Sequence, residues 1–311
     1  MKKEIISKIL GCAATAIITV VLILYMGHML DPRWSEDGMD VIKAFHSIDD
    51  NSLDVIIYGS SHAWRGCDTR VMHDDYGLLA YNYACNWQAI NTILLFLKDS
   101  LRTQTPRVAC VEVGRVDIIE QDVDLDGQIY YTRAIPYFDG KKEYLNQCFN
   151  GDVDRYISYY FPLVMFHENW KIINYENFRF PDPGRFLDTR GYCEGTVSTP
   201  YEIPDYKTME QKEIPKECIA VLDEMVKTCN NKGVELLFFT CPYADDYYYS
   251  DAMKRYAEDN NCKYLNLFEH IDDMGLDGMK DLEDESHLNE SGAGKVATYL
   301  SEFIVDNYAV E

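Results

Sequence analysis

The apolar residues of this chain fall into one long run near the N-terminus and several short runs after it. No Asp, Glu, Lys or Arg occurs from Ile9 to Leu30. As a helix these residues rise about 33 Å, which is enough to cross the hydrocarbon core of a bilayer. The run is longer than the apolar region of a secretory signal, and it has no small-residue cleavage site. The pattern therefore predicts an uncleaved transmembrane helix at residues 9–30.

The short apolar runs are rich in β-branched residues and predict five strands. Helical patterns separate several of these runs, and such alternation indicates an α/β fold with a parallel sheet covered on both sides. The predicted strands are 53–59, 78–84, 107–113, 234–242 and 263–268.

Three stretches have apolar residues at helical spacing. Two of them, 88–102 and 213–231, lie between predicted strands, and a third begins after Asn289, which is a good N-cap residue. Their predicted apolar faces are Ile90, Leu94, Leu97 and Leu101; Ile219, Leu222, Val226 and Cys229; and Ala293, Val296, Ala297, Leu300 and Ile304.

The segment from about 118 to 212 breaks this alternation. It is rich in Tyr, Phe, Pro and Gly, and it predicts an insertion or cap over the edge of the sheet. Its aromatic residues fit either the core of a small subdomain, which we favour, or a surface that stacks on sugar rings. They are Tyr130, Tyr131, Tyr137, Tyr156, Tyr159, Tyr160, Trp170 and Tyr175.

The charged residues on either side of the apolar run predict on which side of the membrane each end of the run lies. Three lysines lie among the first eight residues and acidic residues follow the run, so the positive-inside rule predicts a cytoplasmic N-terminus. The predicted parts are a cytoplasmic stub at 1–8, the anchor at 9–30 and an extracytoplasmic domain at 31–311. The protein is thus predicted to be a single-pass protein of the cell membrane.

Acidic residues dominate the part of the chain after the anchor. The whole chain has a net charge of −23, and residues 31–311 hold 26 basic and 51 acidic residues, a net charge of −25. No local basic patch interrupts this surface, which argues against nucleic acid as a partner. The ten cysteines form no CxxC pair, and their scatter predicts small buried apolar residues more than a disulfide framework.

The first predicted strand ends abruptly in the turn Gly59-Ser60-Ser61-His62. Ligands of open parallel sheets bind outside the carboxyl ends of strands, where a serine nucleophile could act. Serine needs a general base and a carboxylate that orients the base. Asp284 and His287 lie three residues apart before the last helix, and this spacing lets the carboxylate reach the imidazole Nδ1. A turn without chemistry is the alternative, but three filled triad roles favour the nucleophile.

Two motifs at opposite ends of the predicted domain carry a resemblance to a known family. "YGSSH" at 58–62 and "DESHLNESGAGK" at 284–295 resemble the SGNH/GDSL hydrolase superfamily. They are most similar to its membrane-anchored branch, which includes DltD-like teichoic-acid D-alanylation proteins and polysaccharide O-acylation proteins. The resemblance covers roughly residues 50–115 and 230–305. It implies a flavodoxin-like three-layer α/β/α fold with a central parallel sheet.

The resemblance also assigns roles to single residues. It implies that Ser61 attacks an acyl carbonyl, that His287 acts first as base and then as acid, and that Asp284 orients His287. Transfer of the acyl group to water would make the protein an esterase, and transfer to a sugar hydroxyl would make it an O-acyltransferase. The implied chemistry uses no cofactor and no metal.

The oxyanion hole departs from the family pattern. The resemblance implies donors at Ser61 and at Ala84, which stands where the second motif has a glycine and keeps its N–H. Val116 stands where the third motif has an asparagine, and loss of such a donor costs on the order of a hundredfold in rate. Asn86, on the loop after the second predicted strand, is a candidate substitute.

Two further residues and one motif have weaker functional interpretations. His62 is expected to pack in its loop or to contact substrate, and not to act as the base. Arg190, in the segment "DTRGY", is either a substrate contact or an ordinary surface arginine. The segment 122–127, "DVDLDG", starts like an EF-hand loop, but Arg133 replaces the closing glutamate, so a solvated acidic turn is favoured over a calcium site.

The predicted function is acyl transfer to, or removal from, a cell-surface polysaccharide beside the membrane. A membrane-bound O-acyltransferase is a candidate partner, and the acidity of the domain slightly favours a neutral glycan as substrate. Two alternatives stay open: a lipid or small-ester hydrolase with the same triad, and a non-catalytic scaffold or glycan-binding partner of an acylation complex.

Overall fold

The structure is a computed structural model that describes residues 2–119, 128–180, 182–195, 197–243 and 248–308. Within it the chain forms two compact units. The first unit joins residues 1–37 to 149–181, and the second joins residues 38–148 to 182–311.

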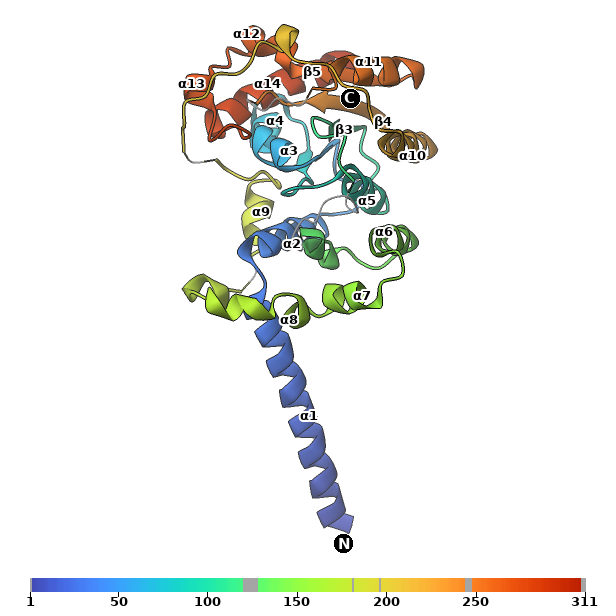
Figure 1. Cartoon of the computed structure of the whole chain (residues 1–311), viewed down its shortest axis with the longest axis vertical. Helices are drawn as coiled ribbons and strands as arrows, with labels where there is room; N and C mark the ends of the chain where they lie inside the picture. Colours follow the sequence, from blue (N-terminus) through green and yellow to red (C-terminus); the bar gives the residue numbers. More distant parts are fainter. Residues whose placement is uncertain (1, 120–127, 181, 196, 244–247, 309–311) are drawn as a thin grey trace. The chain divides into compact units, whose positions relative to one another are not determined.

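The second unit is built on a five-stranded parallel sheet (Figure 1). The prediction of five strands and of a parallel α/β fold is confirmed, and each strand is shorter than the apolar run that predicted it. The spatial order is β2-β1-β3-β4-β5. The strands are β1 (Val55–Tyr58), β2 (Ala80–Asn82), β3 (Val108–Glu112), β4 (Glu235–Thr240) and β5 (Lys263–Asn266).

Burial explains why the strands were visible in the sequence. Every residue of β1, β2 and β3 is buried, so these strands contact other parts of the protein on both faces. The sequence of a strand that is buried on both faces is a continuous apolar run, whereas a strand with one exposed face alternates apolar and polar residues. The turns after such strands stand out by their polar residues.

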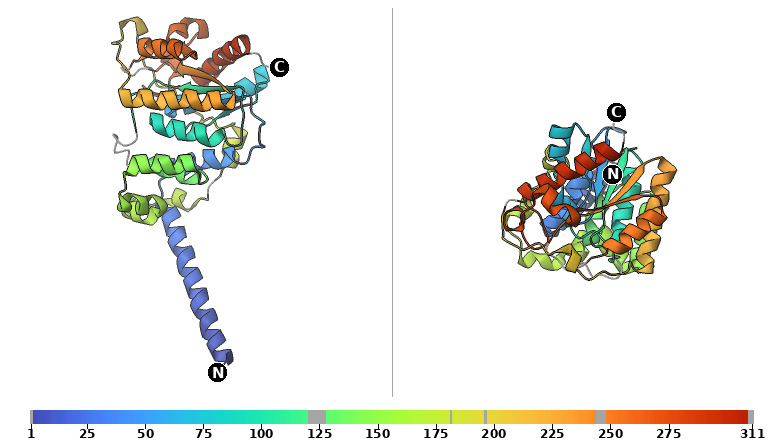
Figure 2. Two further views of the ribbon diagram at one scale, coloured as in Figure 1. Left: turned by 90° about the vertical axis from the view of Figure 1, so that its right-hand side faces the viewer. Right: turned by 90° about the horizontal axis from the view of Figure 1, so that it is seen from above.

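Helices contact the sheet and one another around it. α5 (Ile90–Ser100) contacts β1 and α10 (Lys216–Lys232) contacts β4, and the two helices lie side by side (Figure 2). The short α3 (Ser61–Gly66) contacts β1 and the C-terminal α14 (Glu290–Asn307). Other elements of this part are α4 (Thr69–Tyr76), α11 (Ser250–Asp259), η6 (Leu267–His270), α12 (Ile271–Met274) and α13 (Gly278–Asp281).

The predicted apolar faces of the two inner helices are partly wrong. In α10, Ile219 and Val226 are only half-buried. α5 is buried on most sides, with Leu94 half-buried, because α10 covers it as well as the sheet. The side chains that α10 buries are Cys218, Val221, Leu222, Met225 and Cys229.

The last helix matches its prediction closely. The side chain of Asn289 accepts a hydrogen bond from the backbone N–H of Gly292 and so caps α14. All five residues of the predicted stripe are fully buried. The cap fixes where the helix begins, and therefore fixes the end of the loop that precedes it.

The described part of residues 118–212 consists of short helices joined by turns and irregular segments, with an isolated bridge between Gln211 and Tyr248. Tyr130, Tyr131 and Tyr159 are buried as predicted for a core. The core prediction is wrong for Tyr137, Tyr160, Trp170 and Tyr175, which are exposed. The elements are η2 (Gln128–Ala134), α6 (Asp139–Phe149), α7 (Val153–Tyr160), α8 (Pro162–Met165), η3 (His167–Lys171), η4 (Tyr175–Phe178), α9 (Gly184–Asp188) and η5 (Tyr206–Thr208).

The first unit contains the N-terminal helix α1 (Lys2–Leu30). Its segment Lys3–Leu30 is long and apolar enough to cross a membrane. Within this unit α1 contacts α8, η3 and η4. After α1 the chain enters α2 (Arg33–Phe45), a helix that the sequence pattern did not reveal.

All ten cysteines lie within the described residues, and none of them is in a disulfide bond. Eight are buried, Cys262 is half-buried and Cys12 is exposed on α1. The prediction that they serve as small buried residues and not as a disulfide framework is confirmed for the eight.

The backbone of Gly191 packs closely against the end of β2 at the edge of the sheet. We expect a side-chain methyl group at this position to destabilise the fold. Gly191 has φ +84°, and a Cβ there would collide with the carbonyl oxygen of Asn82 at the end of β2. Gly191→Ala should lower the free energy of unfolding by roughly 3 kcal/mol, measured by denaturant titration.

Gly77 is the matched control for this prediction. It also has a left-handed backbone, with φ +68°, but a Cβ there would meet nothing within 4 Å. Gly77→Ala should therefore cost only the backbone penalty of about 1 kcal/mol. Equal losses in the two variants would contradict the proposed collision.

Candidate active site

The turn after β1 presents Ser61 at the carboxyl end of the sheet. Gly59 has φ +154°, and a Cβ there would lie 2.7 Å from the Cβ atoms of both Ala63 and Glu112. Only glycine fits this place, so the turn can pass directly over β3. Ser60 caps α3 by accepting a hydrogen bond from the His62 N–H, and Ser61 is the first residue of the helix.

The loop before α14 presents His287 and Asp284. Leu282 pairs with Leu288 in an antiparallel bridge, so the residues between them form a narrow hairpin. The N–H of Glu283 donates to the His287 carbonyl at 2.8 Å across this hairpin. Asn289 ends the loop and caps α14. The loop is therefore fixed at both ends by backbone pairing.

Ser61, His287 and Asp284 form a continuous chain of hydrogen bonds. The His287 Nε2 lies 2.8 Å from the Ser61 Oγ, and its Nδ1 lies 2.8 and 2.9 Å from the two carboxylate oxygens of Asp284. An ionised carboxylate can only accept, so Nδ1 carries the proton and donates it to Asp284. Nε2 of the neutral ring is then left as the acceptor for the Ser61 hydroxyl.

The surroundings of Asp284 favour its ionised form. Burial by itself raises the pKa of Asp284, but hydrogen bonds from His287 and from the Ser286 N–H outweigh it and lower the pKa overall. The Ser286 N–H lies 2.8 Å from Oδ1. An ionised Asp284 holds the ring of His287 in one orientation and one tautomer.

An ion pair joins the serine helix to the histidine loop. Arg65 on α3 donates to the carboxylate of Glu283, which precedes Asp284. On the other side of the loop, the buried Asp281 accepts hydrogen bonds from Ser291 and Lys295 of α14. The Arg65–Glu283 pair therefore joins the two halves of the site, which lie more than 200 residues apart in the chain, and Asp281 ties the histidine loop to α14.

A pocket of about 510 Å³ opens over Ser61. The loop after β2, the turn after β3 and the histidine loop form its walls, as expected for the carboxyl edge of a parallel sheet. Its lining residues are Ser60, Ser61, His62, Trp87, Gln88, Arg115, Ile118, Glu285, Ser286 and His287.

Gln88 is a pocket residue that sequence reasoning missed. The residue is buried, at 3% relative exposure, and neither its amide nitrogen nor its oxygen has a hydrogen-bond partner among the described residues. A buried amide without partners costs free energy, on the order of 1–3 kcal/mol. A ligand group in the pocket could satisfy it. The only signal in the sequence was its position two residues after Asn86.

Arg115 is a second pocket residue that the sequence did not reveal. It lies in the segment "GRVD" beside Val116, and it brings a positive charge to the pocket wall. Its Nε lies 3.7 Å from Asp117. This contact holds the guanidinium near the turn that follows β3.

His62 packs in its loop and also lines the pocket. Its ring stacks on Tyr243 with centroids 4.1 Å apart, and its Nδ1 lies 3.9 Å from Glu112. Burial, followed by the charges of His287 and Arg115, lowers the pKa of His62 to about 3. His62 is therefore neutral at physiological pH, and it is His287, not His62, that accepts the hydrogen bond from the Ser61 hydroxyl.

Glu112 is a buried carboxyl group directly beneath the serine turn. It ends β3 and accepts hydrogen bonds from the N–H groups of Gly114 at 2.8 Å and Cys241 at 3.4 Å. Burial raises the pKa of Glu112 to about 7, although these hydrogen bonds and Arg115 lower it in part. The carboxyl group thus ties the ends of β3 and β4 together below the pocket.

The remaining predicted site residues lie apart from the pocket lining. Ala84 and Val116 are buried, and the carbonyl of Asn86 accepts a hydrogen bond from Tyr131. Trp87 and Gln88, the next two residues, reach the pocket instead. Arg190 lines another pocket beside β2. Its backbone carbonyl accepts a hydrogen bond from the Asn82 N–H at 2.9 Å, so the backbone of Arg190 supports the end of β2.

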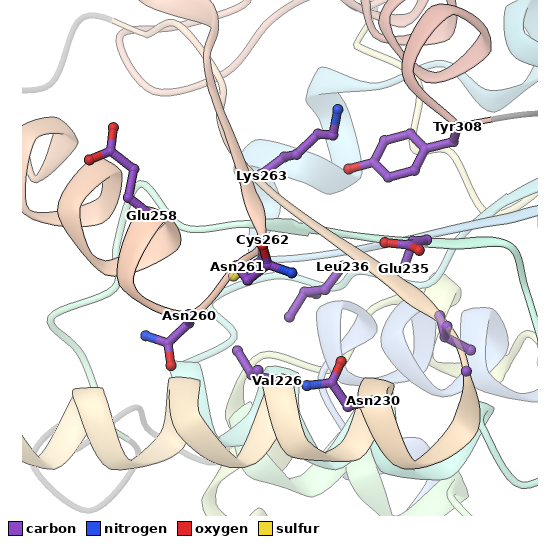
Figure 3. A pocket seen from close by; sticks show the side chains of 12 residues that line it. Val226, Asn230, Glu235, Leu236, Glu258, Asn260, Asn261, Cys262, Lys263 and Tyr308 are labelled. Atoms are coloured by element: carbon purple, nitrogen blue, oxygen red, sulfur yellow. The ribbon is translucent and has the colours of Figure 1, made fainter.

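Another pocket, of about 470 Å³, lies at the opposite edge of the sheet (Figure 3). Glu235 and Lys263, the first residues of β4 and β5, contribute to its wall. Cys262 also lines it, but burial raises the pKa of this thiol to about 11. None of its described lining residues is a histidine, so it offers no counterpart to the relay at Ser61.

The described residues contain no cluster of metal ligands. No group of three or more His, Cys, Asp or Glu side chains in that part of the chain is placed to hold a metal ion. The segment 122–127, which starts like an EF-hand loop, lies outside the described residues.

Comparison with known proteins assigns no family. No model of a known protein family matches the chain, and no curated protein matches its sequence.

Glu112 makes a prediction about stability and pH. The pKa of Glu112 is about 7 in the folded protein and 4.5 for an unperturbed glutamate, the value taken for the unfolded chain. Between pH 4.5 and 7 the folded protein therefore keeps a proton on Glu112 that the unfolded chain has lost. The stability contributed by the protonated group is therefore lost as pH rises from 4.5 to 7, by about 3 kcal/mol. Glu112→Gln keeps an acceptor for Gly114 and Cys241 but cannot ionise.

The measurement is the free energy of unfolding of both proteins across this pH range. We expect the variant to gain stability relative to the wild type as pH rises, because only the wild type must ionise a buried Glu112. His62 and the other titrating groups are present in both proteins and cancel in the difference. A difference that is constant with pH would show that Glu112 does not titrate in this window.

Proposed function

We propose that this protein is a serine esterase or O-acyltransferase that acts on ester bonds of a cell-surface polysaccharide. The observation that carries the proposal is the relay from Asp284 through His287 to Ser61, with 2.8 Å on each side of the imidazole. Activation of serine by histidine, with a carboxylate behind it, is the standard arrangement for acyl transfer.

The chemistry proceeds in two halves. Ser61 Oγ attacks the ester carbonyl while His287 Nε2 takes its proton, and Asp284 stabilises the imidazolium that forms. The tetrahedral intermediate collapses, the C–O bond to the leaving alcohol breaks, and His287 returns the proton to that oxygen. Water or a sugar hydroxyl, deprotonated by His287, then attacks the acyl-serine and releases Ser61.

Gln88 is our candidate for the side-chain donor of the oxyanion hole. Its buried amide lines the pocket without a partner, and the oxyanion would supply the missing acceptor. It would take the role that the family pattern gives to an asparagine, where this chain has Val116. The Ser61 N–H would be the backbone donor, and Ala84 and Asn86 are weaker candidates because neither lines the pocket.

Membership of the SGNH/GDSL superfamily is part of the proposal. The strand order β2-β1-β3-β4-β5 is that of flavodoxin-like sheets, and it supports a three-layer α/β/α arrangement. The two motifs lie at the two ends of the relay, as in that family. The absence of a matching family model means that the resemblance depends on few residues.

The proposed setting is the outer face of a cell membrane. α1 is the anchor, the lysines before it favour a cytoplasmic N-terminus, and the acidic surface of residues 31–311 favours a neutral glycan over an anionic polymer. A membrane-bound O-acyltransferase that supplies or receives the acyl group is the proposed partner.

A lipid or small-ester hydrolase is the second candidate. Trp87 is 57% exposed and lines the pocket with Ile118, which would suit an apolar acyl chain as well as a sugar ring. Turnover of long-chain lipid esters without any glycan would favour this candidate. The scaffold alternative has less support, because the relay is complete.

The identity of the nucleophile can be tested by labelling. The full chain in detergent should react with a fluorophosphonate probe and hydrolyse p-nitrophenyl acetate. Ser61→Ala should abolish labelling, and His287→Ala should lower hydrolysis by roughly 10⁴-fold, because each removes a triad member.

Ser60→Ala is the matched control, since it removes the neighbouring hydroxyl. It should keep labelling and lose about 1 kcal/mol of stability as an N-cap. Labelling that survives Ser61→Ala and vanishes in Ser60→Ala would overturn the assignment. A wild-type protein that takes no label at all would favour the scaffold alternative.

The role of Gln88 can be separated from a structural one. Gln88→Met keeps the volume of the side chain but removes the donor, and it should lower kcat on the order of a hundredfold with KM little changed. The melting temperature should not fall, because the amide has no partner in the part of the chain that the structure describes. A lower melting temperature with unchanged kcat would contradict the proposed role.

A further inference from the structure

Large exposed apolar side chains gather in one short segment of the first unit, residues 149–181. Ten of them lie there, against seven in the rest of the described chain outside α1. Soluble surfaces rarely carry apolar residues at this density without a partner. The most exposed include Val153, Trp170, Ile172, Tyr175 and Phe180.

The helix α7 shows that this exposure is patterned. Val153, Ile157 and Tyr160 follow the spacing of one helical face, and all three are exposed. Tyr159 points elsewhere and is buried, with its ring 5.7 Å from that of Phe149. The helix therefore uses one apolar side for packing and leaves a second apolar side open.

The segment is attached to the C-terminal turn of α1. A Cβ at Gly27 would lie 3.7 Å from the side chain of Pro162 at the start of α8. The amide of Asn169 donates to the Leu30 carbonyl at 2.9 Å, and the His28 ring stacks on Phe180 with centroids 5.9 Å apart. Figure 1 shows α8 against this end of α1.

This attachment fixes the depth of the segment relative to a bilayer. The side chains of α1 are exposed up to Met26, and burial begins at Gly27. From Ile5 to Met26 the helix rises about 33 Å, close to the thickness of a hydrocarbon core. If α1 spans the membrane, the boundary of the core falls where α8 packs.

The composition of the segment fits the region of lipid headgroups. It holds four acidic and three basic residues, a net charge of −1, in a chain whose net charge is −23. Its exposed residues include Trp and Tyr, which are enriched at membrane–water interfaces. An apolar face that carries Trp, Phe or Leu is typical of helices that lie in the plane of the interface.

We propose that residues 149–181 form a collar around the exit of α1 that lies in the interfacial region of the bilayer. The occupant of the exposed apolar surface is lipid, because the surface continues directly from the lipid-exposed side of α1. The collar adds buried apolar area to the anchor and fixes how the chain leaves the membrane. This inference uses the proposed anchor but is independent of the proposed chemistry.

The test uses tryptophan fluorescence of the full chain in phosphatidylcholine vesicles that carry bromine near the top of the acyl chains. Trp170 should be quenched by these lipids relative to unbrominated ones. Trp34 also follows the anchor closely, so all proteins carry Trp34→Phe, and in that background Trp170→Phe should remove the lipid-quenched component. Trp87→Phe is the control, since it removes a tryptophan of similar exposure from the second unit and should keep that component.

Flotation of the vesicles first establishes that the chain is inserted. An inserted chain whose lipid quenching is unchanged by Trp170→Phe overturns the collar, and a chain that does not float overturns both the collar and the anchor. Quenching of Trp170 that fades as protein density rises would assign the surface to a second copy. Labelling by fluorophosphonate is read on the same samples, so failure of the chemistry is scored separately.

Discussion

The hydrogen bond from Ser61 to His287 is the contact on which the proposed function depends, and it joins residues 226 positions apart. The parallel sheet brings the turn after β1 to the same edge as the histidine loop. The cap at Asn289 and the pair Arg65–Glu283 then set the final distance. The sheet, the cap and the ion pair together therefore hold the Ser61 Oγ and the His287 Nε2 2.8 Å apart.

The sequence predicted the sheet and the relay because both have local signatures. Buried parallel strands are continuous apolar runs, and the Asn289 cap, Asp284 and His287 lie within six residues of each other. Gln88 and Arg115 could not be predicted, because their importance comes from burial and from the wall they share. The open face of α7 was also hidden, since an apolar stripe in sequence looks alike whether it meets protein or lipid.

The space beneath the serine turn is a second constraint on the site. Gly59 has no room for a side chain because Glu112 fills the position below it, and Glu112 in turn accepts the Gly114 and Cys241 N–H groups. The turn that carries the nucleophile and the ends of two other strands thus share one buried carboxyl group. A polar group kept in so costly a place indicates that the arrangement of these backbones matters.

The free thiols have a consequence for how the protein matures. Eight of its nine cysteines outside α1 are protected only by the closed core, and none is paired. Before the core forms, all of them are open to an oxidant, and random pairing would trap chains that cannot reach this sheet. On the proposed outer side of the membrane, folding must therefore outpace oxidation, which suits a cell whose surroundings are poor in oxygen.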